Sequence, residues 1–352
     1  MKTKIITAPG IGHLLALLLL TTPGTSPADT LFVPITIGIE ALNSSGVGTV
    51  FTTWASGSAS TSGLAFDNAG NLYAVNASSA TIEKYNPSGE GTVFASGINA
   101  WAIAFDSVGN LYVSSGSNIE KFNSAGVGTP FAHSGQNGFF TSLAFDSAGN
   151  LFAADPDGGI IEKFDSSGVG TVFANPVYNY QFTCLAFDSS GSLYAANNDG
   201  TIEKFNSSGE STVFASSGLS YPSALAFDSA GTLYAANEYN GTIVKFDSSG
   251  NPTVFANTGP GGSGPYAIAF APPPQAILAT GMGVWINQFA LKIIGSSNQI
   301  VFVEACTNLT NPVWTTIGTN TLNTFLGTNG TAYFNDAQWT NYPARFYRVR
   351  SF

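Results

Sequence analysis

A segment of the form Leu-Ala-Phe or Ile-Ala-Phe recurs six times in this chain and limits its fold more than any other feature. The copies are 39, 40, 42, 40 and 43 residues apart and begin at Leu64, Ile103, Leu143, Leu185, Leu225 and Ile268. Each continues through a turn such as DSAGN, a run such as LYAAN, a variable loop, the run IEKF, a second turn and the run TVFA. Short apolar runs bounded by Gly, Asn, Asp and Ser predict antiparallel strands. Four such strands repeated every ~40 residues predict the blades of a β-propeller.

Two columns of the repeat predict how the blades pack. Alanine and phenylalanine occupy successive positions in all six copies, from Ala65 and Phe66 to Ala269 and Phe270. Successive residues of a strand point to opposite faces. We therefore expect the phenylalanines to fill a layer between blades and the alanines to keep the other face thin.

The ends of the repeat region predict how the ring closes. Residues 30–43 align without a gap to residues 110–123, so the N-terminal part supplies strands two, three and four of a blade. Tyr266–Phe270 supplies a first strand, and three prolines from Pro272 then stop the pattern. One strand plus three completes a sixth blade and leaves no long exposed sheet edge. We predict an all-β, six-bladed propeller over residues 29–271.

Units such as SALAFDSAGTLYAANEYNGTIVKFDSSG, residues 223–250, resemble the NHL-repeat and SMP-30/gluconolactonase-like group of six-bladed propellers. The resemblance covers 243 of the 352 residues. It implies a fold that hosts many different activities, so function has to be argued from the site.

The two ends of the chain differ from the repeats. Lys2, Lys4 and an apolar run at Leu14–Leu20 predict a signal peptide over residues 1–28 and a secreted or extracytoplasmic protein, in the periplasm or at the cell surface. That run is too short to span a membrane, which needs ~20 residues. A Pro/Gly linker is expected at 272–284 and a small β-sandwich-like domain at 285–352. The pieces VEACTNLTNPVWTTIGTN and NYPARFYRVRSF resemble a C-terminal module of secreted proteins from Verrucomicrobia-type bacteria, for which a surface-retention or sorting role is one reading.

Composition excludes one class of partner. Lys+Arg number 11 against 21 Asp+Glu, and the three arginines lie in the last eight residues. A nucleic-acid partner is therefore not expected. The two cysteines, Cys184 and Cys306, are expected to be small buried residues rather than a disulfide, because a sister segment carries Ser142 where Cys184 stands.

Variable connections are expected on one face of the ring, where strand two leads to strand three and one blade leads to the next. Variable loops on a rigid scaffold are where binding usually occurs. Aromatic rings beside amide and carboxylate groups suit a sugar or another polar ring compound. The alternative is that these rings plug the channel. The candidate binding residues are Trp101, Phe139, Phe140, Tyr178, Tyr180, Phe182, Tyr221 and Tyr266.

A metal site is the second candidate. Lactonases of the resembling group hold a divalent cation near the channel mouth with Asn, Asp and Glu oxygens, which implies Asp155, Asn197 and Asn237 as Ca²⁺ ligands here. No glutamate of this sequence can be assigned to that metal site. The aspartates at the start of each first turn are expected to form turns rather than bind calcium: Asp67, Asp106, Asp146, Asp188 and Asp228.

Histidine-dependent catalysis has little support. The chain has two histidines, His13 in the predicted signal peptide and His133 alone in a blade link. Hydrolases of the triad type rely on histidine for acid and base catalysis, and so do the streptogramin lyases, another family with this fold. One histidine without a partner does not fill those roles. We predict a secreted binding module for a glycan, a protein or a small polar ligand, with no resident cofactor. A metal-assisted, gluconolactonase-like hydrolase at the same face is the alternative.

Overall fold

A computed structural model describes residues 30–54, 61–135, 138–175, 181–258 and 264–272. Outside these ranges it describes the backbone of seven strands, one of which is residues 14–17. The chain divides into two compact units. One unit is Ala28–Ala271, and the other combines Met1–Pro27 with Pro272–Phe352. Each unit is described by itself below.

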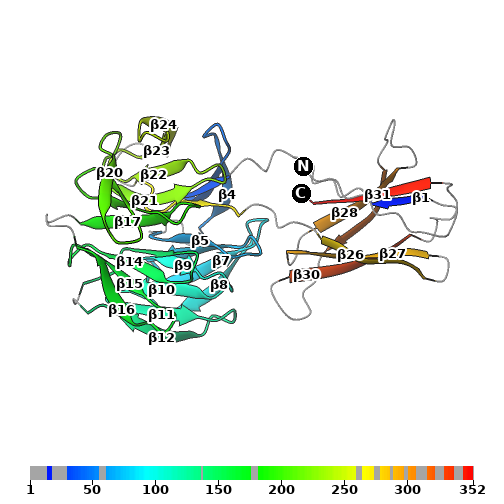
Figure 1. Cartoon of the computed structure of the whole chain (residues 1–352), viewed down its shortest axis with the longest axis horizontal. Coiled ribbons are helices and arrows are strands. Elements are labelled where there is room, and N and C mark those ends of the chain that lie inside the picture. Colours follow the sequence, from blue (N-terminus) through cyan, green and yellow to red (C-terminus); the bar gives the residue numbers. More distant parts are fainter. Residues whose placement is uncertain are drawn as a thin grey trace. The chain divides into compact units, whose positions relative to one another are not determined.

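The first unit contains six four-stranded antiparallel sheets, and every sheet keeps its strands in meander order (Figure 1). Blade 1 is β5 (Leu64–Phe66), β6 (Leu72–Asn76), β7 (Thr81–Tyr85) and β8 (Gly91–Ser96). Blade 2 is β9 (Ile103–Phe105), β10 (Leu111–Ser115), β11 (Asn118–Phe122) and β12 (Gly128–His133). Blade 3 is β13 (Ser142–Phe145), β14 (Leu151–Asp155), β15 (Ile160–Phe164) and β16 (Gly170–Ala174).

The remaining sheets complete the propeller. Blade 4 is β17 (Phe182–Phe187), β18 (Leu193–Asn197), β19 (Ile202–Phe205) and β20 (Ser211–Ala215). Blade 5 is β21 (Pro222–Phe227), β22 (Leu233–Asn237), β23 (Thr242–Phe246) and β24 (Pro252–Asn257). Blade 6 is β25 (Ala269–Phe270), β2 (Leu31–Ile35), β3 (Gly38–Leu42) and β4 (Gly48–Thr53).

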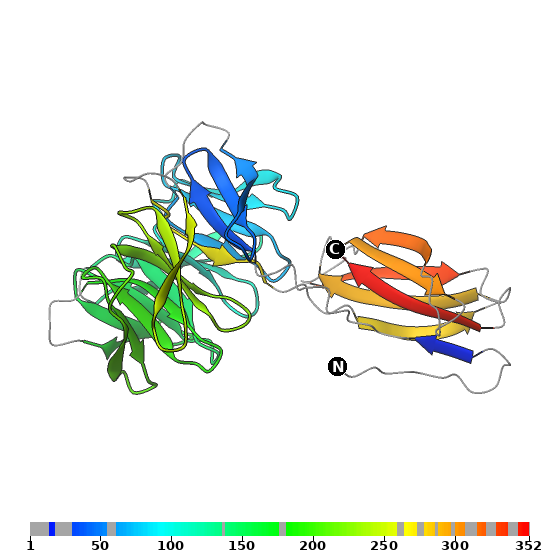
Figure 2. The ribbon, with the colours of Figure 1, turned by 90° about the horizontal axis from the view of Figure 1, so that it is seen from above.

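Blade 6 closes the ring with strands from both ends of the repeat region. β25 pairs antiparallel with β2, Leu31 opposite Phe270 and Phe32 opposite Ala269. Figure 2 shows this yellow strand beside the blue N-terminal strands. The predicted six-bladed ring, closed by one strand and three, is confirmed.

Aromatic rings hold neighbouring blades together. The ring on strand two of each blade lies between the phenylalanine of its own strand four and the phenylalanine of the next blade's strand one. Tyr73, for example, contacts Phe94 and Phe105. The same pair of contacts occurs at all six interfaces, with ring centroids 4.8–5.1 Å apart. The predicted phenylalanine layer therefore includes two further rings at every interface.

The hairpin turns that join strands one to two and three to four share one face, which we call the turn face. Each first-turn aspartate accepts two backbone N–H bonds, at 2.9–3.1 Å from the residue two positions on and at 2.7–2.9 Å from the residue four positions on. The predicted turn-forming role of these aspartates is confirmed. In the second turns glycine also meets the neighbouring blade: Gly126 has φ 77°, and a Cβ there would overlap the Phe94 carbonyl oxygen.

The second unit contains two sheets. One orders β26 (Leu278–Trp285), β27 (Gln288–Ser296) and β30 (Asn329–Asp336). The other orders β1 (Leu14–Leu17), β31 (Ala344–Ser351), β28 (Ile300–Cys306) and β29 (Thr315–Thr321). β1 pairs in parallel with β31. The sandwich-like packing, the linker and the signal peptide stay predictions.

Among the residues that the structure describes, no helix is long and apolar enough to cross a membrane.

Candidate functional site

The first strands of the blades surround the central channel. At the end of the channel opposite the turn face, one aligned position of each blade forms a ring, which we call the mouth ring: Ser62, Trp101, Thr141, Thr183, Ser223 and Tyr266. Four of its members carry hydroxyl groups that bond to a backbone carbonyl of the next blade. Thr183 donates to the Pro222 carbonyl at 2.6 Å, and Ser223 donates to the Pro265 carbonyl at 2.6 Å.

Ser62 and Thr141 make longer bonds of the same kind, to Ala100 at 3.3 Å and to Phe182 at 3.5 Å. The two aromatic members interrupt this pattern. Behind Trp101, Ser114 Oγ supplies the bond to the next blade, at 2.9 Å from the Phe140 carbonyl. Trp101 and Tyr266 remain 49% and 37% exposed, so their rings are available to a ligand.

The channel below the mouth ring is narrow. Two residues further along each first strand stands a Leu or Ile that is only 5–8% exposed: Leu64, Ile103, Leu143, Leu185, Leu225 and Ile268. The hollow between these side chains and the mouth ring has a volume of about 100 Å³. Pockets for small ligands have ~300–1,000 Å³. The channel therefore accommodates a few water molecules, and a larger ligand has to bind at the rim.

The face that carries the mouth ring also carries the blade links and the loops from strand two to strand three, and we call it the loop face. Tyr221 and Tyr239 stack on it with centroids 4.6 Å apart and an interplanar angle of 8°. Tyr221 has φ 53°, a conformation that is strained for a tyrosine. Its carbonyl accepts the Glu238 N–H at 3.1 Å, which ties the two loops together. Tyr239 is 62% exposed and presents its ring to solvent.

Glu238 lies among these rings. Burial raises the pKa of its carboxyl group. Burial also raises the pKa values of Tyr221 and Tyr266; the charges of Tyr239 and Glu238 add to the rise at Tyr221, and the charge of Glu238 adds to it at Tyr266. The Gly264 backbone packs against the Glu238 carbonyl so closely that a Cβ would overlap it. Tyr221, Glu238, Tyr239 and Tyr266 therefore form one cluster at the channel mouth, which we call the tyrosine shelf.

The predicted aromatic residues divide into three groups. Trp101 and Phe139 contact each other at 5.5 Å, and with Tyr221 and Tyr266 they lie on the loop face. Phe140 and Phe182 are fully buried in the core between blades, against Phe164 and Phe205. Because a buried ring offers no surface to a ligand, these two leave the candidate site. Tyr178 and Tyr180 lie outside the described residues.

The three predicted metal ligands are completely buried, and each is hydrogen-bonded near its own loop. Asp155 accepts the Gly158 N–H at 2.9 Å. Asn197 donates to Thr201 at 3.1 Å, and Asn237 donates to the Gly218 carbonyl at 2.9 Å. Among the described residues no group of three His, Cys, Asp or Glu side chains could hold a metal ion. The side-chain oxygens of Asp155 and Asn237 accept hydrogen bonds and Asn197 Oδ1 has no partner, so this set leaves one unbonded oxygen where calcium needs several.

Asp155 instead takes part in a buried polar cluster. Ser134 Oγ is 2.9 Å from Glu162 Oε1 and 3.3 Å from Asp155 Oδ2. All three side chains are buried, and Gly138 lies so close that a Cβ would overlap the Asp155 carboxylate. Burial raises the pKa of Glu162, and the charge of Asp155 adds to the rise. The cluster joins the link after blade 2 to blade 3 and leaves no room for a ligand at Asp155.

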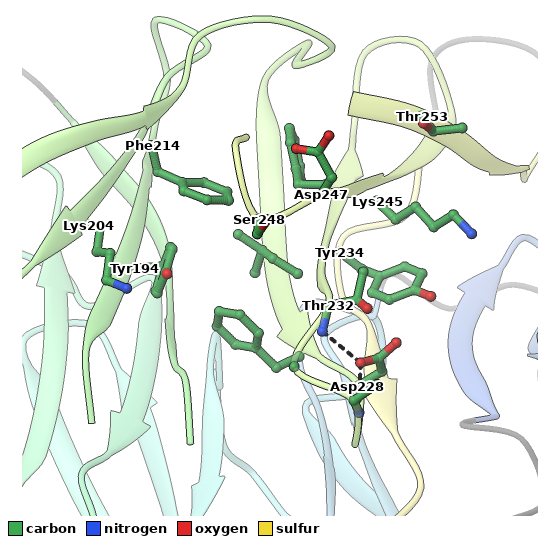
Figure 3. A pocket seen from close by; sticks show the side chains of 15 residues that line it. Tyr194, Lys204, Phe214, Asp228, Thr232, Tyr234, Lys245, Asp247, Ser248 and Thr253 are labelled. Carbon is green, nitrogen blue, oxygen red and sulfur yellow. Dashed lines mark hydrogen bonds between the residues drawn. The ribbon is translucent and has the colours of Figure 1, made fainter. Parts of the chain in front are cut away.

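Another hollow lies on the turn face, between blades 4 and 5, with a volume of about 700 Å³ (Figure 3). Its wall includes Lys204, Tyr194 and Asp228. In blades 1 to 4 the lysine of strand three forms an ion pair of 3.5–3.9 Å with the first-turn aspartate and lies 5.0–5.2 Å from the strand-two ring. Lys245 of blade 5 lies over Phe255 instead, at 5.7 Å. Repeat-forming residues line this groove, so we place the candidate site on the loop face.

The tyrosines of the shelf differ in whether the sequence predicts their position. Tyr221 and Tyr266 stand just before or within the first-strand columns and can be found by alignment of the repeats. Tyr239 cannot, because it stands in a loop of variable length and its position depends on the backbone of Tyr221. His133, the remaining histidine of the propeller, is exposed and hydrogen-bonded to Asn118 at 2.9 Å.

No protein-family model and no curated protein matches this sequence. Solved structures do match. A calcium-binding regucalcin from Agrobacterium tumefaciens is 17% identical with a TM-score of 0.51, over 67% of this chain and 81% of that chain. A gluconolactonase from Xanthomonas campestris is 15% identical with a TM-score of 0.52, over 76% and 92% of the two chains. A catalytically inactive histidine variant of virginiamycin B lyase from Staphylococcus aureus, with quinupristin, is 14% identical with a TM-score of 0.51, over 67% and 92%.

These similarities agree on the architecture. The structural neighbours of this chain are gluconolactonase-like and virginiamycin B lyase propellers with six blades, as the repeats predict. At such low identity the shared feature is the fold, and the ligand has to be argued from the loop face of this chain.

Proposed function

We propose that this protein is a binding module that recognises a glycan at the loop face of its propeller. The observation that carries the proposal is the set of exposed rings around a closed channel. Trp101, Tyr239 and Tyr266 are 49%, 62% and 37% exposed on one face. Aromatic faces stack on sugar rings, and adjacent amide and carboxylate groups hydrogen-bond to the sugar hydroxyls.

The shape of the site also favours binding over catalysis. Enzymes of small substrates enclose the reacting group, but the channel hollow of about 100 Å³ is too small for a sugar ring. A ligand would lie across the mouth, where solvent reaches it. This suits an extended chain with several sugar units better than a lactone that must be surrounded.

The alternative, a metal-assisted hydrolase, is supported only by its fold. It requires several oxygen ligands at the channel mouth. In the described residues the proposed ligands are buried, and of their side-chain oxygens only Asn197 Oδ1 has no hydrogen-bond partner. Hydrolysis of an aldonolactone in the presence of millimolar calcium, at a rate above the uncatalysed one, would reverse this preference.

Titration of the full chain with neutral and amino-sugar oligosaccharides tests the proposal. Tryptophan fluorescence and calorimetry should report binding, and Trp101→Ala or Tyr266→Ala should weaken it about tenfold, the loss of ~1.4 kcal/mol of stacking. Val108→Ala is the matched control, since Val108 is 73% exposed in a turn of the same blade as Trp101, on the opposite face. Equal affinity in all three variants, or no binding of any oligosaccharide, would refute the proposal.

The predicted export is part of the same proposal, because a glycan ligand lies outside the cytoplasm. The N-terminal pattern of Lys2, Lys4 and Leu14–Leu20 supports it. N-terminal sequencing of protein from the culture medium or periplasm should begin near Asp29, and full-length protein in the cytoplasm alone would contradict it.

A further inference from the structure

The lysines of the propeller gather on one of its two faces. Residues 29–271 contain five lysines and no arginine. All five stand at the same position of strand three, next to the second turn: Lys84, Lys121, Lys163, Lys204 and Lys245. Four of them pair with first-turn aspartates. Every lysine of the propeller therefore belongs to the turn face.

The loop face carries acidic side chains without neighbouring lysines. Asp157, Asp199 and Glu238 stand in the loops from strand two to strand three of blades 3, 4 and 5. His133 is the one residue on this face whose side chain can become a cation. A surface with one sign of charge concentrates ligands of the other sign and repels those of its own. Acidic polysaccharides and phosphorylated ligands are therefore poor candidates for this face.

Within this acidic face, the tyrosine shelf places one carboxylate, that of Glu238, beside aromatic rings. Glu238 is hydrogen-bonded to the Tyr221 backbone and packs against Gly264, two residues before Tyr266. Its position is fixed by hydrogen bonds of Glu238 N–H to Tyr221 and of Tyr239 N–H to Ser220, at 3.1 and 3.3 Å. No described cation lies within ion-pair distance of its carboxylate. A carboxylate among aromatic faces is suited to an ammonium group, which gains both an ion pair and cation–π attraction.

We propose that the glycan recognised by the loop face carries free amines, and that an amino-sugar unit stacks on the tyrosine shelf with its ammonium group against Glu238. This inference rests on the proposed glycan-binding function and adds the ligand's chemistry. Tyr239 provides the exposed stacking surface, and Glu238 provides the discrimination between a free amine and an N-acetyl group. The latter has no charge to pair with the carboxylate.

The test compares two probes with the same backbone: a glucosamine oligomer and its fully N-acetylated form, titrated into the full chain at slightly acidic pH. The free-amine oligomer should bind at least tenfold more tightly. Glu238→Gln should reduce this ratio to near one with an unchanged melting temperature, and Tyr239→Ala should weaken both oligomers. Glu210→Gln, which removes one carboxylate from an exposed turn on the opposite face, should keep the ratio and so controls for net charge.

Three outcomes separate the two proposals. If both oligomers bind equally, and Glu238→Gln changes neither, the amine inference is overturned while glycan binding stands. If neither oligomer binds, glycan binding itself is overturned. If a lysine-rich peptide binds more tightly than the amino-sugar oligomer and loses its affinity in Glu238→Gln, the ligand is a basic protein segment, and the amino-sugar assignment is overturned.

Discussion

Phe152→Ala should destabilise the propeller strongly, because Phe152 lies at the centre of the interface between blades 3 and 4. Its ring is 3% exposed and contacts Phe173 and Phe187 with centroids 4.9 and 5.0 Å away. Truncation of a buried phenylalanine costs ~3–5 kcal/mol, through lost burial and the cavity left behind. In a domain of this size each kcal/mol lowers the melting temperature by ~2–4 °C, so we expect a fall of about 6–20 °C.

The repeats supply two matched controls for this variant. Phe152→Tyr should be nearly neutral, because Tyr73, Tyr112 and Tyr194 occupy the same position in other blades. Val172→Ala removes a side chain that is 51% exposed on strand four of the same blade and should change stability by less than ~0.5 kcal/mol.

Thermal and urea unfolding of the full chain, followed by circular dichroism, measure these differences. The urea midpoint of Phe152→Ala should fall with little change in slope, which indicates lost stability rather than a changed unfolded state. A loss below ~1 kcal/mol for Phe152→Ala, or an equal loss for Val172→Ala, would show that the aromatic layer does not hold the blades together.

Three further variants test the loop face. Gly138→Ala should cost ~1–3 kcal/mol in thermal unfolding, because its Cβ would overlap the Asp155 carboxylate; unchanged stability would contradict this packing. Burial raises the pKa of Glu162 in the folded state, so folding retains this proton and stability declines as pH rises above the ordinary value of 4.5. Glu162→Gln should therefore raise the melting temperature at neutral pH but not below pH 4.5, and an effect independent of pH would be inconsistent with it. Tyr266→Ser should bring a hydroxyl to the Thr61 carbonyl, which aligns with the carbonyls that accept the mouth-ring bonds of other blades. The free energy of urea unfolding should rise by ~1 kcal/mol while glycan binding falls; a loss of stability would disprove this.

The fold could be predicted from the sequence because its determinants are local and repeated. Strand lengths, turn residues and the alanine and phenylalanine columns recur in every copy, and each copy predicts the same sheet. The closure of the ring could also be predicted, since residues 30–43 align to the second and third strands of another blade. Six independent copies of one pattern leave little freedom for a different arrangement.

The site could be predicted only in part, because its residues stand where the copies differ. Phe139 and Phe140 are adjacent in a blade link, yet Phe139 is partly exposed and Phe140 is fully buried. Composition alone does not show which of two neighbours points inward. The stacking of Tyr221 on Tyr239 depends on the left-handed backbone of Tyr221, which the sequence gives no reason to expect before a proline.

The mouth ring shows why the exposed rings point to function rather than to folding. At four of its positions a small hydroxyl residue joins one blade to the next, and each such bond contributes ~1 kcal/mol. Trp101 and Tyr266 occupy the other two positions and cannot make the same compact contact, and both stay substantially exposed to water. At Trp101 the bond to the Phe140 carbonyl comes from Ser114 instead, so Ser or Thr would add such a bond only at Tyr266. Two large exposed rings at the mouth of a closed channel therefore fit the proposed ligand that stacks on them.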